Sequence, residues 1–218
     1  MREAFHEQLD RIFRDLAAMC GDVETSVRLA TEALLRGDAG IAERVISGDV
    51  DIDRTRENIE ASAFLLLSLQ QPVASDLRTV VAALRMVSDL ERMGDLSVHV
   101  AKIARLRVPN VAVPAPMRPT IERMAEVAEE MVRRVSKVIT DRDVEEALAL
   151  AHADEEMDRL RRTTFAEMLS ADWPHGVEAA IDVALLGRYY ERIADHAVSV
   201  AHRVVFVVTG ENPASVGA

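Results

Sequence analysis

The chain has 218 residues, enough for one large or two small domains, and hydrophobic residues make up 49% of it, so a sizeable core can be buried. Only 4% of the residues are aromatic and only 9 are glycine, whereas residues that favour helices dominate. A formal net charge of −11 argues against a nucleic-acid-binding face, because it would repel a phosphate backbone, and favours metal cations or basic protein surfaces as partners.

Three long helices are predicted in the first half of the chain, where apolar residues recur at spacings of three and four. The first covers residues 3–35, and Asp38 follows in a position to cap the second. The second covers residues 39–71 and ends there because a residue that precedes a proline, here Pro72, is pushed out of the helical conformation. The third covers residues 74–107.

A linker and three further helices complete the chain. Residues 108–119 hold four of the seven prolines, which a helix interior does not tolerate, so this segment is predicted to be an extended linker. Beyond it, the apolar spacing predicts helices over residues 120–140, 143–171 and 176–209. The predicted fold class is therefore all-α, with six long helices arranged as two bundles of three.

The two halves of the chain are similar to each other. ERMGDLSVHVAK, which starts at Glu91, lies 100 positions before ERIADHAVSVAH, which starts at Glu191, and six of the twelve positions are identical. Likewise, DVDIDR from Asp49 matches DEEMDR from Asp154. An internal duplication explains this, and it predicts two tandem, pseudo-symmetric three-helix repeats. The predicted repeats are residues 1–107 and 120–211, on either side of the linker.

Acidic residues four positions apart recur at matching places in both halves. The members of such a pair share one helix face, about 5–6 Å apart at Cβ, where like charges repel, so something in the fold must offset the repulsion. Two such helices that face each other would offer four carboxylates to one hard or borderline cation. The predicted metal ligands are Asp49, Asp53, Glu91 and Asp95 in the first half, and Asp154, Asp158, Glu191 and Asp195 in the second.

The alternative is that these acids form ion pairs with neighbouring arginines, as is common on charged helices. Chance spacings of this kind are frequent in a chain that is 29% charged, and any single pair is better explained as a solvated or paired face. Recurrence of the pairs in both halves favours metal binding. The arginines that stand beside the acids are Arg54, Arg92, Arg159 and Arg192.

Three histidines and one arginine near the acids need a separate interpretation. His99 lies one turn beyond Asp95, and the sequence favours a metal ligand and a polar surface residue equally at this position. For His196 and His202 the sequence favours a surface position. Arg85 interrupts the apolar stretch 80–87 and needs a partner, for which Asp89 is the nearest candidate.

The sequence carries no motif of a common enzyme class: HExxH, the Glu-x-x-His arrangement of di-iron bundles, GxxxxGK[ST] and GxSxG are all missing from it. We therefore do not expect an enzyme. Two alternatives stay open, namely a metal-dependent enzyme that acts on phosphate compounds, in which a cation would polarise a phosphoryl oxygen, and a purely structural helical interaction module. The single Cys20, the charged amino terminus and the shortness of the apolar runs lead us to expect a soluble, cytoplasmic protein.

Three segments of the chain closely resemble the PhoU family of phosphate-signalling regulators. They are FHEQL from Phe5, QPVASDLRTVVAALRMVSDLERMGDLSVHVAK from Gln71, and RYYERIADHAVSVAHRV from Arg188. The hallmark of that family, a paired E/D-x-x-x-D motif, corresponds here to the same eight acids. The glycine that usually precedes the final aspartate of the motif is present as Gly94 but is Ala194 in the second half, and the asparagine common one turn later is His99 or Ser199.

The resemblance implies a regulator that acts by binding rather than by chemistry. Such a protein represses phosphate uptake and the phosphate-starvation response by connecting the ATPase subunit of a phosphate ABC transporter to a membrane-bound sensor histidine kinase. It would lie at the inner face of the membrane through these partners. The family further implies a homodimer that binds divalent or trivalent metal ions, as a multinuclear iron cluster or as Zn, Mn or Mg.

Overall fold

A computed structural model describes the backbone of residues 2–170 and 172–211, and the side chains of the same residues except 2 and 151–153. The described residues form six long α-helices and no strand, which confirms the all-α prediction. The helices of the first half are α1 (Arg2–Arg36), α2 (Ala39–Gln70) and α3 (Ser75–Arg107). After a short 3-10 helix η1 (Ala115–Met117), those of the second half are α4 (Arg118–Asp141), α5 (Val144–Met168) and α6 (Gly176–Thr209).

The helix ends follow from local chemistry. Asp38 caps α2 as predicted, since its Oδ1 accepts a hydrogen bond from the backbone N–H of Ile41 at 3.0 Å. The end predicted for the fifth helix, Ala171, lies outside the described residues. The predicted linker is not wholly extended, because its last part forms η1 and its apolar side chains Val113 and Met117 are buried against the helices. The proline-rich segment is thus anchored to the core.

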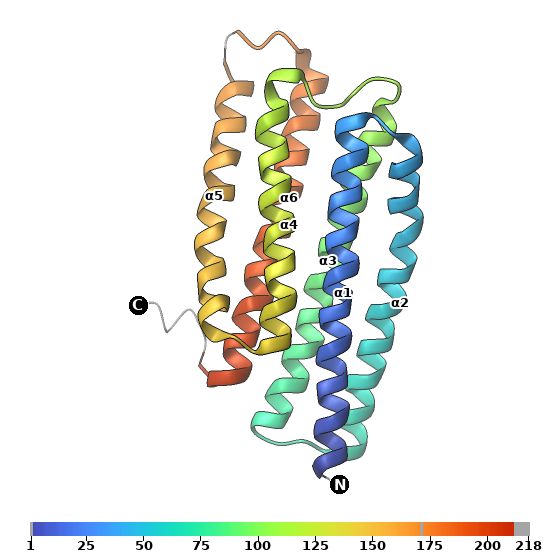
Figure 1. Ribbon diagram of the computed structural model, residues 1–218, viewed down its shortest axis with the longest axis vertical. Coiled ribbons are helices and arrows are strands. Elements are labelled where there is room, and N and C mark those ends of the chain that lie inside the picture. Colours follow the sequence, from blue (N-terminus) through green and yellow to red (C-terminus); the bar gives the residue numbers. More distant parts are fainter. Residues whose placement is uncertain (1, 171, 212–218) are drawn as a thin grey trace.

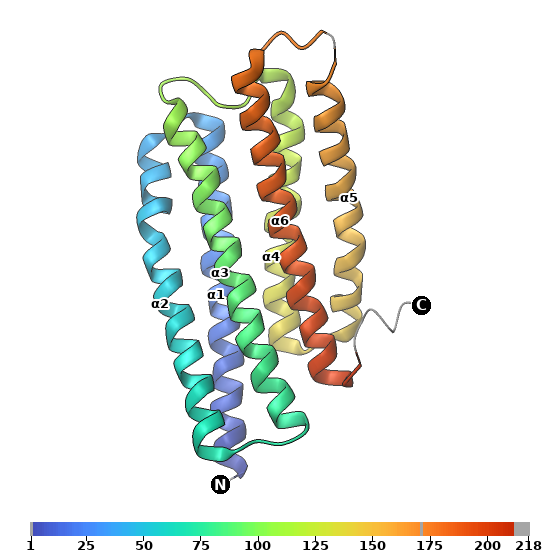
Figure 2. The ribbon, with the colours of Figure 1, turned by 180° about the vertical axis from the view of Figure 1, so that it is seen from behind.

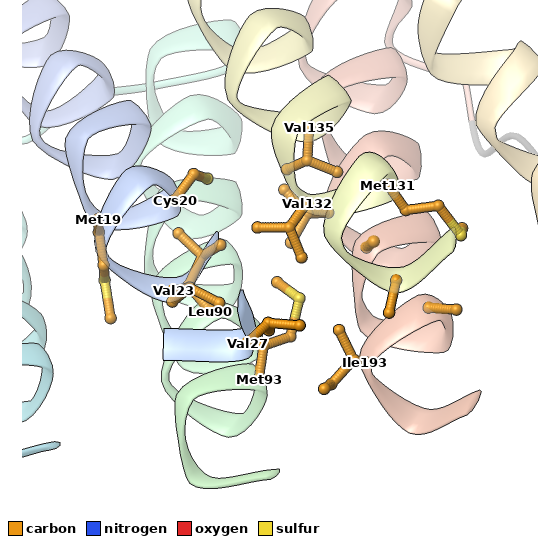
Figure 3. Packing of buried hydrophobic residues seen from close by; sticks show 14 of the residues in the cluster. Met19, Cys20, Val23, Val27, Leu90, Met93, Met131, Val132, Val135 and Ile193 are labelled. Atoms are coloured by element: carbon orange, nitrogen blue, oxygen red, sulfur yellow. The ribbon is translucent and has the colours of Figure 1, made fainter. Parts of the chain in front are cut away.

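Four helices form the centre of the molecule, and the other two lie outside them. Helix α1 packs against α4, and α3 packs against α6, while α2 flanks α1 and α3 and α5 flanks α4 and α6 (Figures 1 and 2). One continuous hydrophobic core runs through both halves. Figure 3 shows Val27 and Met93 from the first half and Val132 and Ile193 from the second pointing into the same buried space. The two bundles therefore share their interior.

Polar contacts between the halves show that α3 and α6 run antiparallel. Near the start of α3, Arg78 Nη2 donates to the carbonyl of Val207, close to the end of α6, at 3.2 Å. At the opposite end of the pair, Arg107 binds Asp182 through two hydrogen bonds of 2.6 and 3.0 Å. The start of each helix therefore lies beside the end of the other, and the middle of α3 faces the middle of α6.

Candidate metal centre

The first acidic set consists of Asp49 and Asp53 on α2 and Glu91 and Asp95 on α3. These helices approach closely here because α3 carries Gly94: a Cβ at this position would lie 3.1 Å from Ile52 Cδ1 and 3.8 Å from Asp49 Oδ1. The glycine of the motif thus has a packing role. Because the helices approach closely, the acids of α2 lie opposite those of α3.

The acids of α2 and α3 lie near enough to act on one another's pKa values. Partial burial raises the pKa of Asp49, and the charges of Asp95 and Asp53 raise it further. Burial likewise raises the pKa of Glu91, and Asp95 adds to this effect from one turn away. Repulsion therefore acts along each helix and between α2 and α3, as the spacing of the acids predicted.

The second acidic set repeats this arrangement with Asp154 and Asp158 on α5 and Glu191 and Asp195 on α6. Burial, followed by the charges of Asp195, Asp158 and Glu191, raises the pKa of Asp154 to about 6. The eight predicted residues thus lie on two pairs of adjacent helices, four residues in each half of the molecule.

The two acidic sets lie at the same level of the α3–α6 pair. Because α3 and α6 pack antiparallel, with Asp89 beside His196, Glu91 and Asp95 lie level with Glu191 and Asp195. Figure 2 shows α2 beyond α3 and α5 beyond α6. His99 marks the boundary between the sets, since its ring stacks on that of Tyr189 on α6 at a centroid distance of 5.3 Å.

The arginines that contact the acids are mostly not those that stand next to them in the sequence. Of the four neighbours, Arg192 binds an acid of a set, Asp195, at 3.1 Å, whereas Arg54 and Arg159 pair with other acids. The further partners are Arg56, Arg161 and Arg188. Arg56 and Arg161 follow Asp53 and Asp158 by three positions, so the helical period, which places such residues on one face, could have identified them.

The donor chemistry of both sets fits a hard cation, since every acid in them offers carboxylate oxygen. A cation would also relieve the repulsion that raises the pKa values. In the conformation described, however, no three His, Cys, Asp or Glu side chains among the residues searched are grouped closely enough to hold a metal ion. Metal binding would therefore require the carboxylates to converge.

The surface interpretation of His196 is wrong, and so is the predicted pairing of Arg85 with Asp89. Arg85 is exposed to solvent and needs no buried partner. Asp89 instead accepts hydrogen bonds from His196 Nδ1 and Arg203 Nε on α6, both at 3.0 Å. Asp89 and His196 are buried between α3 and α6, which the pattern of either helix alone could not indicate. The third histidine, His202, is half-buried, and this burial lowers its pKa.

Within the described residues, no helix is long and apolar enough to cross a membrane. The combination of six long helices, a two-fold repeat and an acidic set in each half defines a class of duplicated helical-bundle proteins.

Comparisons with known proteins identify the class. The family model described as PhoU domain matches residues 16–104 and 121–204. The chain is 46% identical to phosphate-specific transport system accessory protein PhoU homolog 2 of Mycobacterium tuberculosis, over 98% of this chain and 100% of that protein. It is 45% identical to PhoU homolog 1 of Mycobacterium leprae, over 98% and 96% of the two chains. The crystal structure of PhoU from Pseudomonas aeruginosa superposes with a TM-score of 0.89 at 29% identity, covering 95% of this chain and all of that one.

This chain belongs to the PhoU family. The family expected from the sequence segments is thereby confirmed.

Proposed function

We propose that this chain is a non-enzymatic accessory protein of a phosphate transport system, and that it represses phosphate uptake and the phosphate-starvation response when phosphate is plentiful. The proposal is supported by similarity over nearly the whole chain to relatives that are named phosphate-specific transport system accessory proteins. The observation that carries it is that α2, α3, α6 and α5 lie side by side (Figure 2) and carry one acidic set in each half, on a surface that we call the acidic face.

In this proposal the acidic face is the part that binds cations and partners. Each set would hold a divalent or trivalent ion through its four carboxylates, which supplies positive charge at a surface that is otherwise strongly negative. The neutralised face would then dock on the ATPase subunit of the transporter and on a sensor histidine kinase, and basic patches on those partners would match the remaining acids. A homodimer is a further expectation from the resemblance.

Gene deletion tests the regulatory part. A strain without this protein, grown in phosphate-rich medium, should show a raised phosphate-starvation reporter and raised phosphate uptake, and the wild-type gene should restore both. A strain whose reporter and uptake both stay at the wild-type level would contradict the proposal.

Elemental analysis tests the cation-binding part. Protein purified without a chelator should carry metal in stoichiometric amounts and should lose part of it when Glu91 and Asp95 are both changed to alanine. A matched control changes Glu122 and Glu126, an exposed pair with the same spacing on α4, and should leave the metal content unaltered. Equal metal contents in both variants, or no metal in the wild type, would favour a structural module whose acids pair with arginines.

A further inference from the structure

A groove runs between α1 and α2 in the first repeat. The two helices lie side by side along their length (Figure 1), and the groove between them has a volume of about 650 Å³. Its floor includes the buried side chains of Ile12, Ile59 and Leu66, and the exposed Leu65 extends this apolar surface at one end. The groove therefore offers a partner an apolar floor that is already formed.

The equivalent contact in the second repeat is closed by an ion pair. The repeats are offset by 105 positions here, since Asp38 and Asp143 cap α2 and α5 in the same way. Arg123 on α4 binds Glu156 on α5 through hydrogen bonds of 2.8 and 3.1 Å and so bridges the two helices. The counterpart of Arg123 is Ala18, which lines the groove and is too short to form such a bridge. Among the described side chains, no ion pair joins α1 to α2.

The charged side chains that line the groove are not used within the molecule. Arg11, Asp15 and Asp22 form no ion pair or side-chain hydrogen bond in the part of the chain that the structure describes. Partial burial raises the pKa of Asp22, and the negative charge of Asp51 on α2 raises it further. Unpaired charges around an apolar floor are typical of an interface that a partner completes.

The shape of the groove fits an α-helix. On α1 the wall extends from Gln8 to Asp22, which corresponds to about 21 Å or about four helical turns. On α2 the wall is formed by residues between Thr55 and Leu66. A helix that lies between two others buries an apolar stripe against the floor and presents its charged residues to the rim.

The charges of the rim determine which helix fits. Arg11 lies toward one end of the groove and Asp22 toward the other, about 16 Å apart along α1, with Asp15 between them. A complementary helix therefore carries an acidic residue opposite Arg11 and a basic residue about three turns away, opposite Asp22. Between these two charges, its face toward the floor is apolar.

We propose that the groove between α1 and α2 is the docking site for an amphipathic helix of a partner protein, with an apolar stripe between one acidic and one basic residue. The inference rests on the partner binding of the proposed function, and it assigns part of that binding to a groove that contains none of the eight acids. Since the equivalent contact is bridged in the second repeat, the groove also distinguishes the first repeat from the second for a partner.

Binding measurements with a filled groove test this. Biolayer interferometry would use the purified full-length chain, with the transporter ATPase subunit and the detergent-solubilised sensor kinase of the same organism as probes. Ser62→Trp, which places a bulky side chain in the groove, should weaken the binding of one of the two probes by at least about ten-fold. Circular dichroism and thermal unfolding confirm that the variant is folded.

Ser47→Trp is the matched control. Both serines are exposed on α2, and each donates its hydroxyl hydrogen to the carbonyl four positions earlier at 2.8 Å, but Ser47 does not line the groove. This control should bind both probes as wild type does.

Charge reversal tests the pattern of the rim and does not depend on the fold of Ser62→Trp. Arg11→Glu and Asp22→Lys should each weaken the binding of the same probe by about five-fold, because each places like charges opposite one another. Arg44→Glu, which reverses an exposed charge on α2 outside the groove, should leave the binding unaltered.

Three results would overturn the inference and leave the proposed function standing. They are equal binding of both probes by wild type and Ser62→Trp, no effect of either charge reversal, or a change in Ser62→Trp of the oligomeric state alone, which would assign the groove to a second copy of the chain. Wild type that binds neither probe would overturn both the inference and the docking part of the proposed function. The deletion phenotype is independent of all these results.

Discussion

Asp89→Ala tests how strongly the buried polar contacts between α3 and α6 hold the two halves together. The side chains of Asp89 and His196 are each 7% exposed, and Asp89 accepts hydrogen bonds from His196 and Arg203 at 3.0 Å. The alanine variant would leave the buried His196 without this acceptor. Arg203, which is 29% exposed, could instead turn toward water.

The size of the effect follows from this difference in exposure. Removing one partner of a fully buried ion pair costs about 3–5 kcal/mol, and the access of Arg203 to solvent reduces this to about 2–3 kcal/mol. For a chain of this length the melting temperature should fall by about 5–10 °C. Urea unfolding at pH 7 measures the loss of stability. The m value, which is the slope of the free energy of unfolding against urea concentration, should stay the same.

Asp51→Ala serves as the control, because Asp51 forms an ion pair with Arg54 of similar distance, 2.7 Å, on the exposed surface of α2. It should cost less than about 0.5 kcal/mol. If Asp89→Ala cost no more than this control, the contacts between α3 and α6 would contribute nothing to stability, and the reasoning from burial would be refuted.

The same variant has a defined pH dependence. Burial by itself would raise the pKa of Asp89, but the hydrogen bonds from His196 and Arg203 outweigh it and lower the pKa overall. Since the pKa is lower in the folded state, this stabilisation is complete above the unfolded value of about 4 and is lost as the pH falls through the folded value. The difference in stability between wild type and Asp89→Ala should therefore shrink below about pH 4.

Three further outcomes are expected. Thr31 donates its hydroxyl hydrogen to the carbonyl of Val27, so Tyr190 must donate to Thr31. Tyr190→Phe should lower the free energy of unfolding in urea by about 1 kcal/mol, and Thr31→Val should lower it by about 2 kcal/mol, because it leaves the buried O–H of Tyr190 unpaired. Burial and, after it, the charges of neighbouring acids raise the pKa of Asp154 to about 6, so its charge destabilises the fold increasingly as the pH rises from the unfolded pKa of about 4 to about 6. Asp154→Asn should therefore stabilise by about 1 kcal/mol at pH 8, after allowance for solvent screening, but not below about pH 4. Burial raises the pKa of the Cys20 thiol, which should react with a disulfide reagent only as fast as the protein unfolds.

The helices and the membership of the acidic sets could be predicted because both depend on local periodicity. Residues four apart share a face in any α-helix, and Asp49 and Glu91 recur at matching places as Asp154 and Glu191. The duplication therefore carried information about tertiary structure. Because each half has one acidic pair on each of two neighbouring helices, the two pairs of a half are expected to face each other. The eight acids lie on two pairs of adjacent helices, α2 with α3 and α5 with α6, as this reasoning requires.

The contacts between the halves could not be predicted, because they depend on how the bundles are rotated against each other. Arg85 and Asp89 lie one turn apart on α3, yet Arg85 is exposed and Asp89 is buried against α6. The partner of Asp89 is His196, 107 positions away, and the sequence of neither helix identifies it. Arg161, by contrast, follows Asp158 by three positions, so the helical period alone places it on the same face of its helix.

The antiparallel packing of α3 against α6 has a consequence for recognition. Because the two repeats are related by a half-turn, a partner that lies across these helices meets nearly the same backbone in two opposite orientations. The fold alone does not tell such a partner which end is which. That distinction is left to the side chains that break the symmetry. At one pair of equivalent positions, 105 residues apart, Glu60 accepts a hydrogen bond from Arg56, whereas the Phe165 ring lies under the guanidinium of Arg161.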